Sequence, residues 1–232
     1  MVAPTDDSVA SIGASEWVEF AGDEVRLAGQ IDYPEAKRPS GGYPLIFVIQ
    51  HGTSTSRQDY AHVSNFGTEA GCAVFRWDKR GTGKSGHGYQ GSVERDTLLA
   101  YAYALSLPSI NTAKVVILAQ CEGTLLLAQS FADFSAIQQP LGVILAGNML
   151  DADAITPLAC PVHIVISKND WNDWRTYAEK AADAHAQTHK QDASFYVATN
   201  TNRLLMYTSG NTFHKGSESS IKHWLKNTCQ IS

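Results

Sequence analysis

Long apolar runs and closely spaced cysteines are both missing from this chain of 232 residues. No stretch approaches the roughly 18 consecutive apolar residues that a membrane-spanning helix needs. The four cysteines are scattered and form no C-x-x-C pair: Cys72, Cys121, Cys160 and Cys229. We therefore expect neither a disulfide framework nor a zinc site, and free thiols in a reducing compartment, the cytoplasm, are the simplest interpretation.

An excess of positive charge is lacking as well. The chain has 18 Lys and Arg against 23 Asp and Glu, a formal net charge of −5. Proteins that bind nucleic acid or anionic membranes usually carry basic patches, so neither partner is expected. Residues 1–15 lack the positive region and apolar run of a signal peptide and are expected to form a loose tail. No repeat or linker divides residues 16–232, which are expected to form one domain; the oligomeric state stays open.

What the sequence does contain is an alternation of apolar runs with helix-like segments. Continuous apolar runs are typical of strands buried on both faces of a parallel sheet; they occupy residues 44–50, 72–77, 114–119, 141–146 and 161–167. Helical periodicity is found at 57–70, 93–107, 124–134, 171–185 and 221–225. A pair of strands, 17–20 and 25–33, precedes them. The alternation predicts an α/β fold, with a mostly parallel central sheet and helices on both faces.

In such a sheet the functional residues lie in loops at the carboxyl ends of the strands. Unusual residues follow four of the expected strands, at 51–54, 78–85, 119–123 and 167–170, and a late histidine occurs within 211–216. The glycines of residues 81–86 spell G-x-G-x-x-G. However, no helix is expected to open there and no acid ends a strand about 20 residues later, so a dinucleotide cofactor is not expected.

The stretch from Ala119 to Gly123, with Cys121 at its centre, resembles the nucleophile elbow of the α/β-hydrolase superfamily, whose pattern is small-x-nucleophile-x-small. The order of nucleophile, acid and histidine also matches, with Asp170 after an expected strand and His214 near the end. The resemblance covers nearly everything from Val25 onward. Cysteine as nucleophile resembles the lidless dienelactone hydrolases, and residues 147–160 are too few to form a helical cap.

The resemblance implies a mechanism. Cys121 would attack an acyl carbonyl, His214 would take the thiol proton as general base and return it as general acid, and Asp170 would orient His214. The backbone N–H groups of Thr53 and Glu122 would form the oxyanion hole. The implied activity is hydrolysis of a small-molecule carboxylic ester, thioester or lactone through an acyl-Cys121 intermediate, with no cofactor and no metal.

Alternatives remain open for two roles and for the function. Asp173 competes with Asp170 for the acid, although Asp170 stands closer to the expected strand. His223 competes with His214, although it lies inside an expected amphipathic helix. The chain could also be an acyltransferase that uses the same intermediate, a non-catalytic ligand-binding member of the fold, or a serine hydrolase in which Cys121 replaces the serine.

Overall fold

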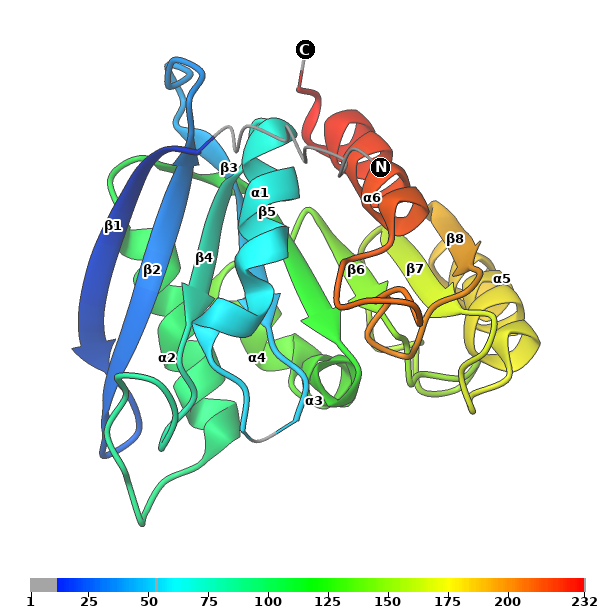
Figure 1. Ribbon diagram of the computed structural model, residues 1–232, viewed down its shortest axis with the longest axis horizontal. Coiled ribbons are helices and arrows are strands. Elements are labelled where there is room, and N and C mark those ends of the chain that lie inside the picture. The colour runs from blue at the N-terminus through cyan, green and yellow to red at the C-terminus, as the bar shows by residue number, and fades with distance from the viewer. Residues whose placement is uncertain (1–11, 53, 232) are drawn as a thin grey trace, which may run out of the picture.

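One mixed sheet of eight strands runs through the computed structural model, which describes residues 12–52 and 54–231 (Figure 1). The strands are β1 (Ile12–Ala21), β2 (Arg26–Pro34), β3 (Tyr43–Ile49), β4 (Ala73–Trp77), β5 (Ile110–Gln120), β6 (Gly142–Ala146), β7 (Val162–Ser167) and β8 (Ala193–Ala198). Their spatial order is β1-β2-β4-β3-β5-β6-β7-β8. The pairings of β2 with β1 and with β4 are antiparallel, and the remaining pairings are parallel.

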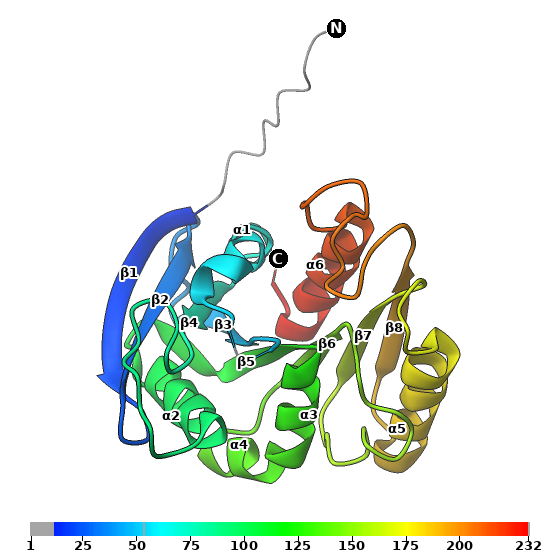
Figure 2. The same cartoon turned by 60° about the horizontal axis from the view of Figure 1, so that its bottom comes forward.

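Helices cover both faces of this sheet, as Figure 2 shows. The helical elements are a short 3-10 helix η1 (Arg57–Tyr60), α1 (Ala61–Glu69), α2 (Val93–Ser106), α3 (Glu122–Gln129), α4 (Phe131–Ile137), a π-helical segment η2 (Arg175–Lys180), α5 (Ala181–His189) and α6 (Lys215–Cys229). Helices α1 and α6 lie on one face, and α2, α3, α4 and α5 lie on the other. The predicted α/β architecture is therefore confirmed, and it is that of the α/β-hydrolase fold.

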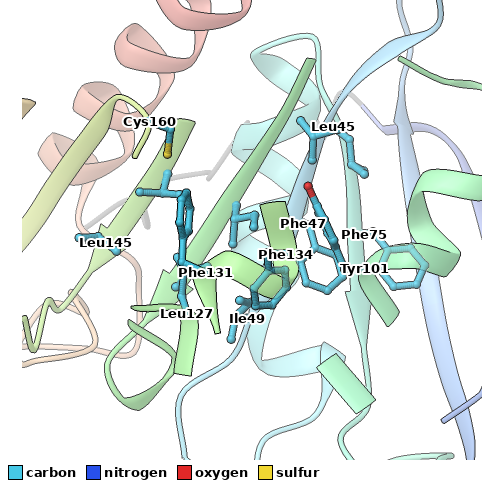
Figure 3. Packing of buried hydrophobic residues seen from close by; sticks show 14 of the residues in the cluster. Leu45, Phe47, Ile49, Phe75, Tyr101, Leu127, Phe131, Phe134, Leu145 and Cys160 are labelled. Atoms are coloured by element: carbon cyan, nitrogen blue, oxygen red, sulfur yellow. The ribbon is translucent and has the colours of Figure 1, made fainter. Parts of the chain in front are cut away.

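The core consists of two hydrophobic clusters, one on each face of the sheet. Every residue of β3 is buried, as the continuous apolar run predicts for a central parallel strand. In the larger cluster, Phe47 meets Tyr101 of α2 edge to face at 5.1 Å between ring centroids, and Tyr101 meets Phe134 of α4 in the same way at 5.2 Å (Figure 3). These contacts pack α2 and α4 against the sheet.

Two strands differ from the sequence-based expectation, and the helix expected at 124–134 is divided into α3 and α4. Strand β1 begins at Ile12, so residues 12–15 belong to the sheet and not to a tail; Ser15 pairs with Asp32 in β2, and its hydroxyl donates to the Asp32 carboxylate at 2.6 Å. Residues 1–11 lie outside the described part. Strand β8 has only half-buried or exposed residues over most of its length, so it lacks the apolar run by which the other parallel strands were predicted.

The carboxyl ends of the parallel strands lie at one edge of the sheet, next to the loops in which functional residues are expected. Ile49 of β3 pairs with Ala119 of β5, and Gln120 pairs with Ala146 of β6. Residues 147–161, which follow β6, form turns and no helix, so no helical cap covers this edge. None of the helices in the described residues is long and apolar enough to cross a membrane.

Candidate active site

Cys121 stands on the sharp turn between β5 and α3. Its backbone has φ 47° and ψ −118°, a conformation that residues with a side chain rarely adopt and that is typical of strain at functional sites. A Cβ added to Gly123 would come within 2.7 Å of the Ile49 carbonyl oxygen, so only glycine fits there. Ala119 is completely buried on the other side of the turn. The structure thus has the elbow geometry that the small-x-nucleophile-x-small pattern predicts.

The thiol of Cys121 lies in a tight and mostly dry environment. Cys121 is 1% exposed, and a Cβ added to Gly147 at the end of β6 would lie 3.0 Å from its sulfur. Burial raises the pKa of the Cys121 thiol to about 12, with the carboxylate of Glu122 adding to the effect and the guanidinium of Arg203 opposing it. At neutral pH this thiol is protonated, so nucleophilic attack needs a base.

Asp170, which follows β7, is held by an arginine. Its side chain is fully buried, and Arg203 Nη2 lies 2.8 Å from its Oδ1. Arg203 Nε donates to the same carboxylate at 3.0 and 3.2 Å. The guanidinium also stacks on Trp171, 3.8 Å from the ring centroid, and Trp171 is 76% exposed. Trp171 therefore covers this ion pair instead of the hydrophobic core.

His214 lies at the start of α6 and caps that helix. Its Nδ1 accepts the backbone N–H of Ser217 at 3.0 Å, and its ring packs edge to face on Tyr207 at 5.0 Å between centroids. Burial lowers the pKa of His214. Among the described residues, no hydrogen bond joins His214 to Asp170 or to Cys121. The three predicted residues therefore follow strands at the carboxyl edge of the sheet without hydrogen bonds among them, and the triad stays a prediction.

In the part of the chain that the structure describes, the side-chain hydrogen bonds of the two rival residues stay within one helical turn. Asp173 is exposed and accepts a hydrogen bond from the Thr176 hydroxyl at 3.1 Å. His223 is exposed on α6, with its Nε2 3.1 Å from Asn227 Nδ2.

The loop after β3 faces the elbow. The carboxylate of Glu122 accepts the backbone N–H of Gly52 at 3.1 Å. Although burial opposes ionisation of Glu122, hydrogen bonds from its own amide and from that of Gly52 lower the pKa of its carboxyl. Of the two predicted oxyanion donors, Glu122 follows the elbow as expected, whereas Thr53 lies outside the described residues. Within the described part of this loop, the N–H of Gly52 points toward the elbow, since it donates to Glu122.

A cavity of about 470 Å³ opens beside the elbow. Its wall includes Gln120 next to the nucleophile position together with His51, His62, Asn202, Met206 and Phe213. The wall combines amide and imidazole groups and the carboxylate of Asp59 with apolar surface, as small-molecule sites do. No group of three or more potential metal-ligating side chains lies together in the part of the chain that the structure describes.

Comparison with known proteins supports the fold. No family model and no curated protein matches the sequence. Among solved structures, Est1E from Butyrivibrio proteoclasticus with bound ferulic acid is similar, with a TM-score of 0.67 and 17% identity over 92% of this chain and 99% of that one. A dienelactone hydrolase-like promiscuous phosphotriesterase, P91, from metagenomic libraries gives 0.68 and 15% over 94% and 98%. The 2,6-dihydroxy-pseudo-oxynicotine hydrolase gives 0.70 and 14% over 94% and 68%. At these identities the likeness shows the α/β-hydrolase fold.

Proposed function

We propose that this protein hydrolyses a small carboxylic ester, thioester or lactone through an acyl intermediate on Cys121. The observation that carries the proposal is the backbone of Cys121, held at φ 47° and ψ −118° where β5 meets α3. Strain of this kind is retained where it serves a function, and here it places a thiol at the amino end of a helix. The names of two structural neighbours, a hydrolase and a dienelactone hydrolase-like phosphotriesterase, agree with hydrolytic chemistry.

In the proposed reaction His214 accepts the Cys121 proton while the sulfur bonds to the acyl carbon. The leaving group departs with that proton, and water then hydrolyses the thioester with His214 again as base. Asp170 is the proposed orienting acid. Its carboxylate binds Arg203 mainly through Oδ1, and the reaction requires His214 to approach that carboxylate. Residues 199–213, which contain Arg203 and lead directly into His214, are the segment that would rearrange.

The Asp170–Arg203 pair favours a second candidate, a non-catalytic ligand-binding member of the fold. A buried acid that binds a guanidinium and a thiol that burial keeps protonated would together favour an unreactive site. In that case the cavity beside Gln120 would bind a small molecule without converting it.

Intact-mass spectrometry after exposure to p-nitrophenyl acetate, an acetyl thioester and a simple lactone separates the two candidates. We expect one acyl group on the parent and none on Cys121→Ala. Cys160→Ala is the matched control, because Cys160 is a buried thiol away from the elbow. The Cys160→Ala variant should therefore be acylated like the parent. Absence of any adduct with the whole panel would contradict the hydrolase and favour the binding protein.

The proposed base and acid are tested by the same assay in time-resolved form. His214→Ala should slow acylation by about 10²–10⁴, the usual contribution of a general base. Asp170→Asn should slow it through the wrong histidine tautomer. Asp173→Asn and His223→Ala are the controls and should acylate at the parental rate. If His214→Ala acylated as fast as the parent, the base would have to be assigned elsewhere.

A further inference from the structure

The side chain of Lys79, the second residue after β4, contacts the loop that follows β3. The residue is only 6% exposed. Its Nζ donates to the carbonyl of Gln50 at 3.0 Å, forms a close hydrogen bond to the carbonyl of Gly52, and lies 3.5 Å from the carbonyl of His51. Three consecutive backbone carbonyls therefore converge on a single ammonium group.

This convergence fixes the direction of the loop amides. In a trans peptide the C=O of one residue and the N–H of the next point to opposite sides, and the described residues contain no cis peptide. Carbonyls that turn toward Lys79 therefore turn the following N–H groups away from it. The observed contacts agree, since His51 N–H donates to the Tyr60 hydroxyl at 2.7 Å and Gly52 N–H donates to the Glu122 carboxylate at 3.1 Å.

The arrangement joins the loop to the nucleophile turn. Glu122 directly follows Cys121, so the Gly52 N–H that it accepts is held beside the elbow, and the carbonyl of the same peptide group, that of His51, lies 3.5 Å from Lys79 Nζ. An oxyanion hole in this fold needs one amide after the nucleophile and one from this loop. Donors act strongly only when they are preorganised, because reorganisation at the moment of reaction weakens them.

We propose that Lys79 is a positioning residue that fixes the loop at residues 50–52, holds the Gly52 amide beside the turn at Cys121 and so preorganises the oxyanion hole. This inference rests on the proposed acyl-transfer chemistry of Cys121. Lys79 touches no reacting atom and acts through the loop.

The environment of Lys79 argues against a simple ion-pair role. Within the described residues no carboxylate lies at salt-bridge distance from its Nζ, and the backbone carbonyls take the place of a counter-ion. Burial lowers the pKa of Lys79 to about 8, and the carboxylate of Glu122 only partly offsets this. A buried charge without an ion-pair partner is costly, so its retention is best explained by the loop geometry that it imposes.

The test compares Lys79→Met, which keeps the apolar stem and removes the ammonium, with Lys79→Arg, which keeps a charged donor. Lys84→Met is the matched control, because Lys84 belongs to the same loop but is exposed and rests on Trp17. The first readout is hydrogen exchange of the His51 and Gly52 amides, followed by NMR. We expect exchange at least about tenfold faster in Lys79→Met, largely restored in Lys79→Arg and unchanged in Lys84→Met, as expected when a few hydrogen bonds cease to order a segment.

The second readout is acylation of Cys121 by p-nitrophenyl acetate. Loss of oxyanion stabilisation should lower the acylation rate constant by about 10–10² and leave the half-saturating concentration nearly unchanged, since the amides act on the transition state. Parental exchange of both amides in Lys79→Met would overturn the proposal, and so would parental acylation despite faster exchange. A parent that never acylates would refute the proposed hydrolase, whereas the exchange result would still decide whether Lys79 orients the loop. If Lys79→Met fails to fold, Lys79→Gln takes its place.

Discussion

The guanidinium of Arg203 binds the carboxylate of Asp170 through both Nε and Nη2, and this ion pair lies close enough to Cys121 for both charges to act on the thiol. Asp170 thus binds an arginine at the position from which a triad acid would orient a histidine. Burial keeps the pKa of the Cys121 thiol high, Arg203 lowers it and Asp170 raises it, so replacement of Arg203 tests both the acid and the thiol.

Replacing Arg203 with Met leaves the buried Asp170 carboxylate unpaired. We expect the free energy of unfolding to fall by about 3–5 kcal/mol, the usual cost of breaking a buried ion pair on one side. The pKa of the Cys121 thiol should rise further, since Arg203 lowers it at present. Urea unfolding and the pH dependence of Cys121 alkylation measure the two effects. The double variant Arg203→Met/Asp170→Asn should regain part of the stability; an Arg203→Met chain as stable as the parent would show that the pair contributes nothing.

The elbow could be predicted from sequence because its determinants are local. Ala119 and Gly123 must be small since the chain passes close to its own backbone, and that demand is visible within five consecutive residues. The central strands could be predicted for a similar reason, since burial on both faces leaves a continuous apolar run.

Arg203 could not be predicted in the same way. It lies in residues 199–213, which pair only through isolated bridges such as Thr201 with Tyr207 and Met206 with Phe213 and show neither periodicity nor a motif. Arg203 follows β8 and contacts Asp170, which follows the neighbouring strand β7. The sequence pattern did not predict β8. The late position of His214 in the chain indicated its role, but the residues around it did not predict that its ring would cap α6.

Stability should depend on pH through His163. This buried histidine in β7 lies 2.8 Å from the Ser194 hydroxyl through Nδ1 and 2.9 Å from the Ser220 hydroxyl through Nε2. Burial lowers the pKa of His163 from 6.5 to about 4, and the nearby His223 adds to the effect. Between pH 6.5 and about 4, His163 therefore binds a proton in the unfolded chain but not in the folded chain. The free energy of unfolding that is present above pH 6.5 thus decreases as the pH falls toward 4.

The loss attributable to His163 should reach about 3 kcal/mol at most, given about 1.4 kcal/mol for each pKa unit. Urea unfolding of the parent and of His163→Asn at several pH values between 7 and 4 measures it. The variant should start less stable, because it loses the serine contacts, but should decline less steeply with acid. Parallel curves would mean that His163 does not set the acid sensitivity.

The last prediction concerns whether cysteine belongs at position 121. The sulfur of Cys121 lies close to Gly147, where an added Cβ would sit 3.0 Å away, so the pocket around it is tight. Sulfur forms longer bonds than oxygen, and productive geometry tolerates errors of only about 0.5 Å. A site built around cysteine should place its donors for the longer bond, and Cys121→Ser should then acylate much more slowly than the parent. A site built for serine would instead give a cysteine form that acylates but deacylates poorly, and Cys121→Ser would turn over esters faster.

Separate measurement of acylation and deacylation with p-nitrophenyl acetate distinguishes these cases. We expect the serine variant to be slower in acylation, and a serine variant that outpaces the parent in steady-state turnover would identify the chain as a serine hydrolase with a substituted nucleophile.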